Sequence, residues 1–308
     1  MSAPWPALDV ARDSPTIATL HLASQLLGKL RVSHAPWANH GWQVALHPLA
    51  SGLVTDPTAC PDGRSFTLAL DLTDHAITLR VSDGASDSVA LADGLTIAAL
   101  HRDFITMLDR HGLPSNFHGT PNELPDAMSF ADDRTPRAYD PASAERVRDM
   151  LALIVPIFEQ FRAGFVGKAS PVHFWWGSFD LAVSRFSGRP APPHPGGIPG
   201  LPDRITREAY SHEESSAGFW PGNAAMPAPP IFYAYAYPEP AGFRKASIEP
   251  AEASFNTELG EFVLPYEAVA TAADPEATLL AFLQSTYAAA ADLAHWDRAA
   301  LERSPVAP

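Results

Sequence analysis

Two neighbouring stretches of alternating apolar and polar residues constrain this fold more than any other feature. In residues 66–72 every second residue is Phe or Leu, and residues 77–81 alternate Ile, Leu and Val with Thr and Arg. Successive side chains of a strand point to opposite faces, so each stretch predicts a strand with one buried face. The short connection at Thr73-Asp74 favours an antiparallel hairpin.

Four other segments have apolar residues spaced three or four apart, which predicts helices. Each begins with a residue that can cap a helix, and in three of them a proline follows at the first helical position. The second is expected to stop at Gly112, with Pro114 just beyond. The expected helices begin near Ser14-Pro15, Thr96, Asp140-Pro141 and Asp274-Pro275.

Residues 172–186, 230–237 and 261–266 predict further strands between the third and fourth helices. Segment 187–204 is rich in proline and glycine, which predicts a loop. Most linking segments are short, and short links favour antiparallel neighbours. The expected fold class is therefore α+β with antiparallel sheets.

The order helix, strands, helix occurs twice, which indicates an internal duplication. The first helix is expected to end at Gly28-Lys29 and the third at Gly167-Lys168, 139 residues later, in a chain with three lysines. The expected units are residues 1–139 and 140–308, the second carrying the site. The same offset pairs His34 with His173, Trp37 with Trp176 and Val44 with Val183.

Composition excludes several classes of function. The net charge is −14, shared equally between the halves 1–150 and 151–308, so no basic face is expected and nucleic-acid binding is disfavoured. The single cysteine, Cys60, excludes an intramolecular disulfide. The N-terminus lacks the pattern of a secretory signal, and the apolar runs are too short to span a membrane. We therefore expect a cytoplasmic protein without nucleic-acid or membrane partners.

Three segments of the second half concentrate acidic, imidazole and aromatic side chains, and the first half has no comparable density. They are PVHFWWGSFDLAVSRFSGRP (171–190), REAYSHEESSAGFWPG (207–222) and PPIFYAYAYPEP (229–240). These segments resemble the signature of an uncharacterised bacterial family, a domain of unknown function, and the similarity extends over nearly the whole chain. The resemblance implies a family and no activity.

Four residues of these segments are candidates for catalysis: His173, Asp180, Glu208 and His212. If residues 207–214 are helical, Glu208 and His212 lie four apart on one face and can present two ligands to a divalent metal. His173 or Asp180 can supply the third. Without a metal, His212 can act as general acid or base, oriented by a carboxylate. The ordinary alternative is a hydrogen-bonded surface pair.

Six residues are candidates for binding a substrate: Trp175, Arg185, Arg207, Trp220, Tyr233 and Tyr235. The tyrosines share one face of their predicted strand and can form a wall for an aromatic or sugar-like ligand, or simply a half-exposed strand. The arginines can clamp an anion or balance local carboxylates. If residues 173–180 form one regular strand, His173 and Asp180 point to opposite faces. A bulge at Gly177-Ser178 would place both side chains on the same face.

The sequence therefore favours an enzyme that acts on a small, anionic or aromatic molecule in the second unit. A non-catalytic binding module is the first alternative, and a structural protein with an aromatic core is the second. The substrate and the oligomeric state stay open.

Overall fold

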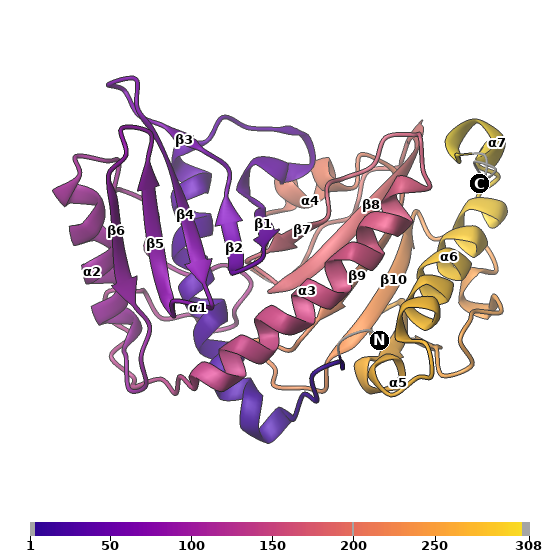
Figure 1. Cartoon of the computed structure of the whole chain (residues 1–308). Helices are drawn as coiled ribbons and strands as arrows, with labels where there is room; N and C mark the ends of the chain where they lie inside the picture. Colours follow the sequence, from indigo (N-terminus) through magenta and orange to yellow (C-terminus); the bar gives the residue numbers. More distant parts are fainter. Residues whose placement is uncertain (1–3, 199, 304–308) are drawn as a thin grey trace.

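Strands from both halves of the chain join in one antiparallel sheet (Figure 1). The computed structural model describes residues 4–198 and 200–303. The sheet has twelve strands, in the order β11-β12-β10-β9-β8-β7-β1-β2-β4-β5-β6, with β3 paired to β4. The two halves meet where β1 pairs with β7, at Leu46 opposite Phe174. The expected α+β class is confirmed, and the division into two duplicated units stays a prediction.

Strands β1 to β6 belong to the first half of the chain, and β7 to β12 belong to the second. They are β1 (Leu46–Leu49), β2 (Gly52–Thr55), β3 (Thr58–Ala59), β4 (Ser65–Asp71), β5 (Ala76–Val81), β6 (Ser86–Ala90), β7 (His173–Trp175), β8 (Asp180–Pro190), β9 (His212–Trp220), β10 (Ile231–Tyr237), β11 (Ser254–Asn256) and β12 (Glu261–Pro265).

Long helices cover the sheet, and short helical turns connect its parts. They are α1 (Val10–His34), η1 (Asn39–Val44), α2 (Ile97–Arg110), α3 (Pro141–Ala163), α4 (Asp203–Ala209), η2 (Phe243–Lys245), α5 (Tyr266–Ala270), α6 (Pro275–Leu293) and α7 (Arg298–Leu301). Among the described helices, none has the length and apolar character needed to cross a membrane.

Three of the four expected helix starts are correct, because each has a side chain that caps the first turn. Thr96, Asp140 and Asp274 accept hydrogen bonds from backbone N–H groups of α2, α3 and α6. The first start is wrong. Asp9 caps α1 by accepting from the N–H of Arg12 at 2.8 Å, so the helix begins at Val10 and Pro15 lies inside it.

The sheet divides the second half into an apolar side and a polar side. On the apolar side, Phe219, Phe232 and Leu264 are fully buried in the core, and α3 and α6 pack against each other and onto the sheet (Figure 1). The opposite face lies towards η1, α4 and the loops around residues 123 and 194. Its polar character explains why β9, which begins His212-Glu213-Glu214, was not expected as a strand.

Two expected elements of the second half are wrong. Residues 172–186 form a hairpin, β7 and β8, in which Trp175 lies opposite Asp180. Because the chain turns at residues 176–179, His173 and Asp180 share a face without the bulge that a single strand would need. Helix α4 ends at Ala209 and strand β9 begins at His212, so Glu208 and His212 are not on one helix.

The residue-by-residue correspondence between the halves does not hold at the residues expected to match. His34 is the last residue of α1, whereas His173 begins strand β7. Lys29 lies within α1, whereas Lys168 follows the end of α3 at Ala163. The offset of 139 residues therefore aligns helical residues of the first half with non-helical residues of the second.

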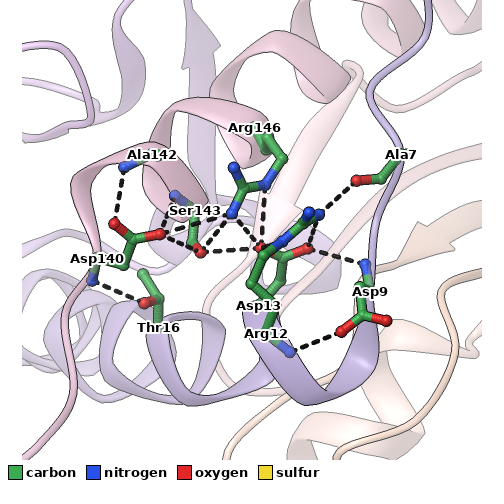
Figure 2. A network of polar contacts seen from close by, with 9 residues as sticks. All are labelled: Ala7, Asp9, Arg12, Asp13, Thr16, Asp140, Ala142, Ser143 and Arg146. Carbon is green, nitrogen blue, oxygen red and sulfur yellow. Dashed lines mark hydrogen bonds and ion pairs between the residues drawn. The ribbon is translucent and has the colours of Figure 1, made fainter.

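Helix α1 is buried on nearly all sides, and a polar network fastens its first turns to α3 (Figure 2). The carboxylate of Asp13 is 1% exposed and accepts from Arg12, Arg146 and the Ser143 hydroxyl. Asp140, the cap of α3, accepts from the same hydroxyl at 2.8 Å. A buried carboxylate is tolerated only when donors replace the lost water, as they do here.

Candidate functional site

Seven acidic and phenolic residues gather on the polar side of the sheet and the loops that cover it. They are Glu123, Asp180, Tyr210, Glu214, Tyr233, Tyr235 and Glu261, called here the Asp180 cluster. The strand register brings most of them together: Tyr233 lies opposite Gly218, which lies opposite Ala182, two residues from Asp180. Alternate residues of antiparallel neighbours face the same side, so these side chains share one surface.

Gly218 lets Tyr233 cross strand β9. A Cβ atom on residue 218 would lie 2.1 Å from Cζ of the tyrosine ring, closer than any side chain allows. The ring therefore lies over the glycine and reaches from β10 to β8, where its hydroxyl donates a hydrogen bond to Oδ2 of Asp180. The absence of a side chain at 218 is what brings this pair together.

Asp180 is 5% exposed and accepts from two hydroxyl groups. Tyr233 donates to one carboxylate oxygen and Ser178 to the other. Burial raises the pKa of Asp180 to about 6, although both hydroxyl bonds act to lower it. The ionised and protonated forms of Asp180 are therefore both populated near neutral pH.

The pKa values of three other carboxyl groups of the cluster are also raised towards neutral pH. Burial, reinforced by the negative charge of Asp180, raises the pKa of Glu123 to about 7 and that of Glu261 to about 7. Burial raises the pKa of Glu214 to about 8, against the effects of the Ser184 hydroxyl and the charge of Lys168. The charge of Asp180 couples the ionisation of Glu123 and Glu261 to its own, because like charges at close range disfavour each other.

The phenols of the cluster form a linked row. The Tyr210 hydroxyl donates to the Tyr235 hydroxyl at 3.1 Å, and the Tyr233 and Tyr235 rings stack with centroids 6.3 Å apart. Burial raises the pKa of Tyr233 and Tyr235 well above 10, and nearby carboxylates add to the shift. Each phenol therefore keeps its proton at neutral pH and can donate a hydrogen bond.

A proline-rich segment covers one end of the row. The imidazole of His194 stacks on the Tyr210 ring at 4.7 Å and lies 5.2 Å from the Tyr237 ring. The Tyr237 hydroxyl donates to the carbonyl of Pro192 at 3.0 Å. Tyr233, Tyr235, Glu123 and Glu261 are each intermediate in exposure.

Two residues have strained backbone conformations: Glu123 of the cluster and Phe179, which precedes Asp180. Glu123 has φ of 56° and Phe179 has φ of 66°. A residue other than glycine in this left-handed region costs ~1–3 kcal/mol, and such strain gathers at functional sites. The carboxylate of Glu123 lies directly against Gly177, where a Cβ would be 2.0 Å from Oε1.

Three residues expected from the sequence lie beside Asp180. Trp175 is its partner across the hairpin, and the Trp220 indole donates to the carbonyl of Ser178 at 3.3 Å. His173 is 2% exposed, and its ring packs edge-on against Trp175 at 4.6 Å. Burial lowers the pKa of His173 to about 3, so this imidazole is neutral at ordinary pH.

Three others lie away from Asp180, around α4. Glu208 accepts from the Trp37 indole at 2.6 Å. The His212 ring lies 6.1 Å from the His40 ring. Arg207 donates to the carbonyl of His194 at 3.2 Å and so holds the proline-rich segment. Within residues 4–198 and 200–303, no three metal-ligating side chains are grouped to hold an ion.

Arg185 lies on the opposite, apolar side of the sheet. Its guanidinium lies 3.5 Å from the Phe161 ring centre and 4.3 Å from that of Tyr287, and it donates to the carbonyl of Phe161. Burial lowers the pKa of Arg185 to about 10. The arginine contacts α3 and α6 and does not reach the Asp180 cluster.

Four members of the cluster were not expected: Glu123, Tyr210, Glu214 and Glu261. Glu214 and Tyr210 stand inside the quoted REAYSHEESS segment, so that segment was a usable signal for them. Glu261 begins a short strand and Glu123 lies in a loop of the first half, and no local pattern distinguishes either. The first half therefore contributes one carboxyl group to the site.

The comparisons with known proteins give a family and no activity. Neither the curated proteins nor the solved structures contain a match to the chain. The model of a family of unknown function (DUF5996) matches residues 5–303. The resemblance expected from the sequence is confirmed at the level of the family, since the match covers nearly the full length. The chain belongs to the family of unknown function DUF5996.

Proposed function

We propose that this protein is an enzyme that carries out general acid–base chemistry on a small molecule at the Asp180 cluster. The observation that carries the proposal is the contact of Tyr233 with Asp180 across Gly218, surrounded by Glu123 and Glu261. Building this contact uses a glycine and two strained backbone positions, which a simple core would not need.

The chemistry follows from the proton affinities of the cluster. A group transfers protons best when its pKa is close to the working pH, and Asp180, Glu123 and Glu261 have pKa values of about 6, 7 and 7. Ionised Asp180 would accept a proton from the substrate, and a protonated glutamic acid would return one. The phenols would donate hydrogen bonds that orient the substrate.

The substrate is a neutral polar or cationic molecule. Among the residues that the structure describes, no arginine or lysine makes an ion pair with Glu123, Asp180, Glu214 or Glu261. An anion would meet carboxyl groups and phenols around Asp180, and the nearest cation, Lys168, acts on Glu214. A hydroxyl or amine can accept or donate at these groups, and aromatic rings favour a cation.

A non-catalytic binding module is the second candidate, favoured by one specific observation. Both carboxylate oxygens of Asp180 already accept hydrogen bonds, from Ser178 and Tyr233. Each oxygen keeps a second lone-pair site, but Asp180 is 5% exposed, so one of these hydroxyls would have to turn away to open that site to a substrate. In a binding module both hydroxyls would stay in place.

The test uses the variants Asp180→Asn and Tyr233→Phe, with Glu267→Gln of exposed α5 as the control. Thermal unfolding is measured with putrescine, choline, glucose and citrate, and compounds that raise the melting temperature are followed for turnover by proton NMR. We expect stabilisation of wild type and control by an amine or sugar, not by citrate, with loss of the effect in both variants. Binding and turnover that persist in Asp180→Asn contradict the proposal.

We further infer two duplicated units, residues 1–139 and 140–308, in a cytoplasmic protein without nucleic-acid partners. The sheet supports the division, because β1–β6 come from the first unit and β7–β12 from the second. The net charge of −14 supports the absence of nucleic acid.

A further inference from the structure

We infer that Gln25, a buried residue of α1, is a positioning residue that sets the separation of Glu123 and Asp180. The inference rests on the proposed function of the cluster, and it adds a residue that touches neither carboxyl group. Gln25 is fully buried in a helix surrounded by apolar core. A buried amide is costly unless its hydrogen bonds are made, so its partners show what it holds.

Gln25 holds the loop that carries Glu123. Its Oε1 accepts from the backbone N–H of Asn122 at 2.9 Å, and its Nε2 donates to the carbonyl of the same residue at 3.1 Å. Lys29, one turn further along α1 and 6% exposed, donates to Oδ1 of Asn122 at 2.6 Å. The residue before Glu123 is therefore fixed through its backbone and its side chain.

The same amide reaches the turn that carries Asp180. Nε2 of Gln25 lies 3.3 Å from the carbonyl of Trp176, at the start of that turn. His21, one turn earlier on α1, has Nε2 at 2.9 Å from the carbonyl of Gly177. Its Nδ1 accepts from the N–H of Ala224 at 3.2 Å.

His21, Gln25 and Lys29 are spaced four residues apart, and such residues lie on one face of a helix. They form a polar stripe along one face of α1, and the stripe contacts both segments that bear the carboxyl groups. Those two segments contain the strained residues Glu123 and Phe179. Strained backbone persists only where the surroundings fix it, and here the stripe supplies the fixing contacts.

The separation of the two carboxyl groups determines how Glu123 titrates. Burial and the charge of Asp180 together raise the pKa of Glu123 from 4.5 to about 7. If the Gln25 contacts are lost, the loop can move away from Gly177, and both effects weaken. The pKa of Glu123 then falls towards its ordinary value.

The experiment is a carbon-13 NMR titration of side-chain carboxyl groups in full-length protein. In Gln25→Leu, which keeps the buried volume, we expect the pKa of Glu123 to fall by one unit or more. Lys29→Met keeps the Gln25 bonds and should lower it by less. Asp180→Asn, which removes the charge itself, measures how much of the shift comes from Asp180.

The control is Thr19→Val, on the same buried helix. Thr19 is 1% exposed and donates to the carbonyl of Ala138 at 2.7 Å, away from the cluster. We expect it to lower the melting temperature and leave the titration of Glu123 unchanged. If Gln25→Leu behaves like this control, Gln25 is structural only and the inference is wrong. If Gln25→Leu does not fold, Gln25→Asn, whose shorter amide cannot reach Asn122 and Trp176 together, takes its place, and an unchanged Glu123 titration there overturns the inference equally.

This test and that of the proposed function fail separately. The titration needs no ligand, so it reports on positioning even if the cluster has no substrate. A lowered Glu123 pKa in Gln25→Leu, together with ligand binding that is unaffected in Asp180→Asn, would keep the positioning and reject the function.

Discussion

Tyr233 on strand β10 donates its hydroxyl hydrogen bond to Asp180 on strand β8, although strand β9 lies between them. Side chains two strands apart do not ordinarily touch, because the strand between them carries its own side chain at that position. Gly218 removes this obstacle. The pair therefore depends on three strands keeping one register, and it is sensitive to changes at any of the three residues.

Gly218→Ala should separate the pair. The added methyl group cannot share space with the Tyr233 ring, so the ring must move and Asp180 loses a donor. The hydrogen bond lowers the pKa of Asp180, so its loss should raise that pKa above about 6. Overpacking should also cost about 1–3 kcal/mol of unfolding free energy.

NMR titration and urea unfolding check both results. Gly119→Ala is the matched control, because a Cβ there meets nothing within 4 Å. An unchanged Asp180 pKa in Gly218→Ala would show that the contact does not depend on the glycine.

Glu214→Gln should stabilise the protein at high pH. The folded protein raises the pKa of Glu214 from 4.5 to about 8, so it binds the proton more tightly than the unfolded chain does. This contribution to stability is complete below pH ~4.5 and is lost as the pH rises through ~8. A neutral glutamine avoids the loss, worth up to about 5 kcal/mol at pH 9.

Urea unfolding from pH 4.5 to pH 9 measures the difference. Wild type and variant should converge at the acidic end and separate at the alkaline end. Parallel curves across the whole range would mean that Glu214 ionises normally in the folded protein.

Asp13→Asn should weaken the junction of α1 with α3 that Figure 2 shows. The change removes the nearer carboxylate partner of Arg146, at 2.6 Å, and leaves Asp140 at 3.5 Å. Losing a buried ion-pair partner is expected to cost about 2–4 kcal/mol at pH 7. Hydrogen bonds from Arg12 and other donors depress the pKa of Asp13, so this stability exists above pH ~4 and is lost in acid.

The measurement is unfolding free energy at pH 7 and pH 3, with exposed Glu267→Gln as the reference. The penalty of Asp13→Asn should shrink at pH 3. A penalty that is the same at both pH values would mean that shape, not charge, holds the junction.

Arg185→Met should leave ligand binding intact and keep unfolding free energy within about 1 kcal/mol of wild type, or raise it. The guanidinium is 4% exposed and lies among the rings of Phe161, Phe165 and Tyr287. Replacing a buried charge by an apolar chain of similar length is often neutral or stabilising. Calorimetry and the ligand screen check this, and loss of binding would place Arg185 in the site after all.

Local rules predicted the helices of this chain better than its site. Thr96, Asp140 and Asp274 were identifiable as helix starts because a cap acts within its own first turn. The first start failed because Pro15 resembled a first helical residue, while the actual cap was Asp9. The hairpin turn at residues 176–179 was not foreseen, because its Gly177-Ser178 pair was interpreted as a possible bulge within one strand.

The site depends on contacts that no local pattern encodes. Tyr233, Tyr235 and Asp180 could be proposed from a concentration of polar and aromatic residues. Glu123 and Glu261 could not, since only strand pairing and the folding of a distant loop bring them near Asp180. The spacing of Glu208 and His212 suggested a shared helical face, but helix α4 ends at Ala209 and strand β9 begins at His212.

The stripe of α1 has a consequence for any attempt to dissect this protein into pieces. Glu123 and the amide that holds it belong to the first 139 residues, whereas Asp180 and its tyrosine belong to the rest. A fragment expressed from residue 140 onwards would keep Asp180 and the tyrosines. It would lack Glu123 and Gln25, the residue that holds the Glu123 loop. Both halves therefore contribute to one site, and neither half alone should reproduce the carboxyl pKa values of the Asp180 cluster.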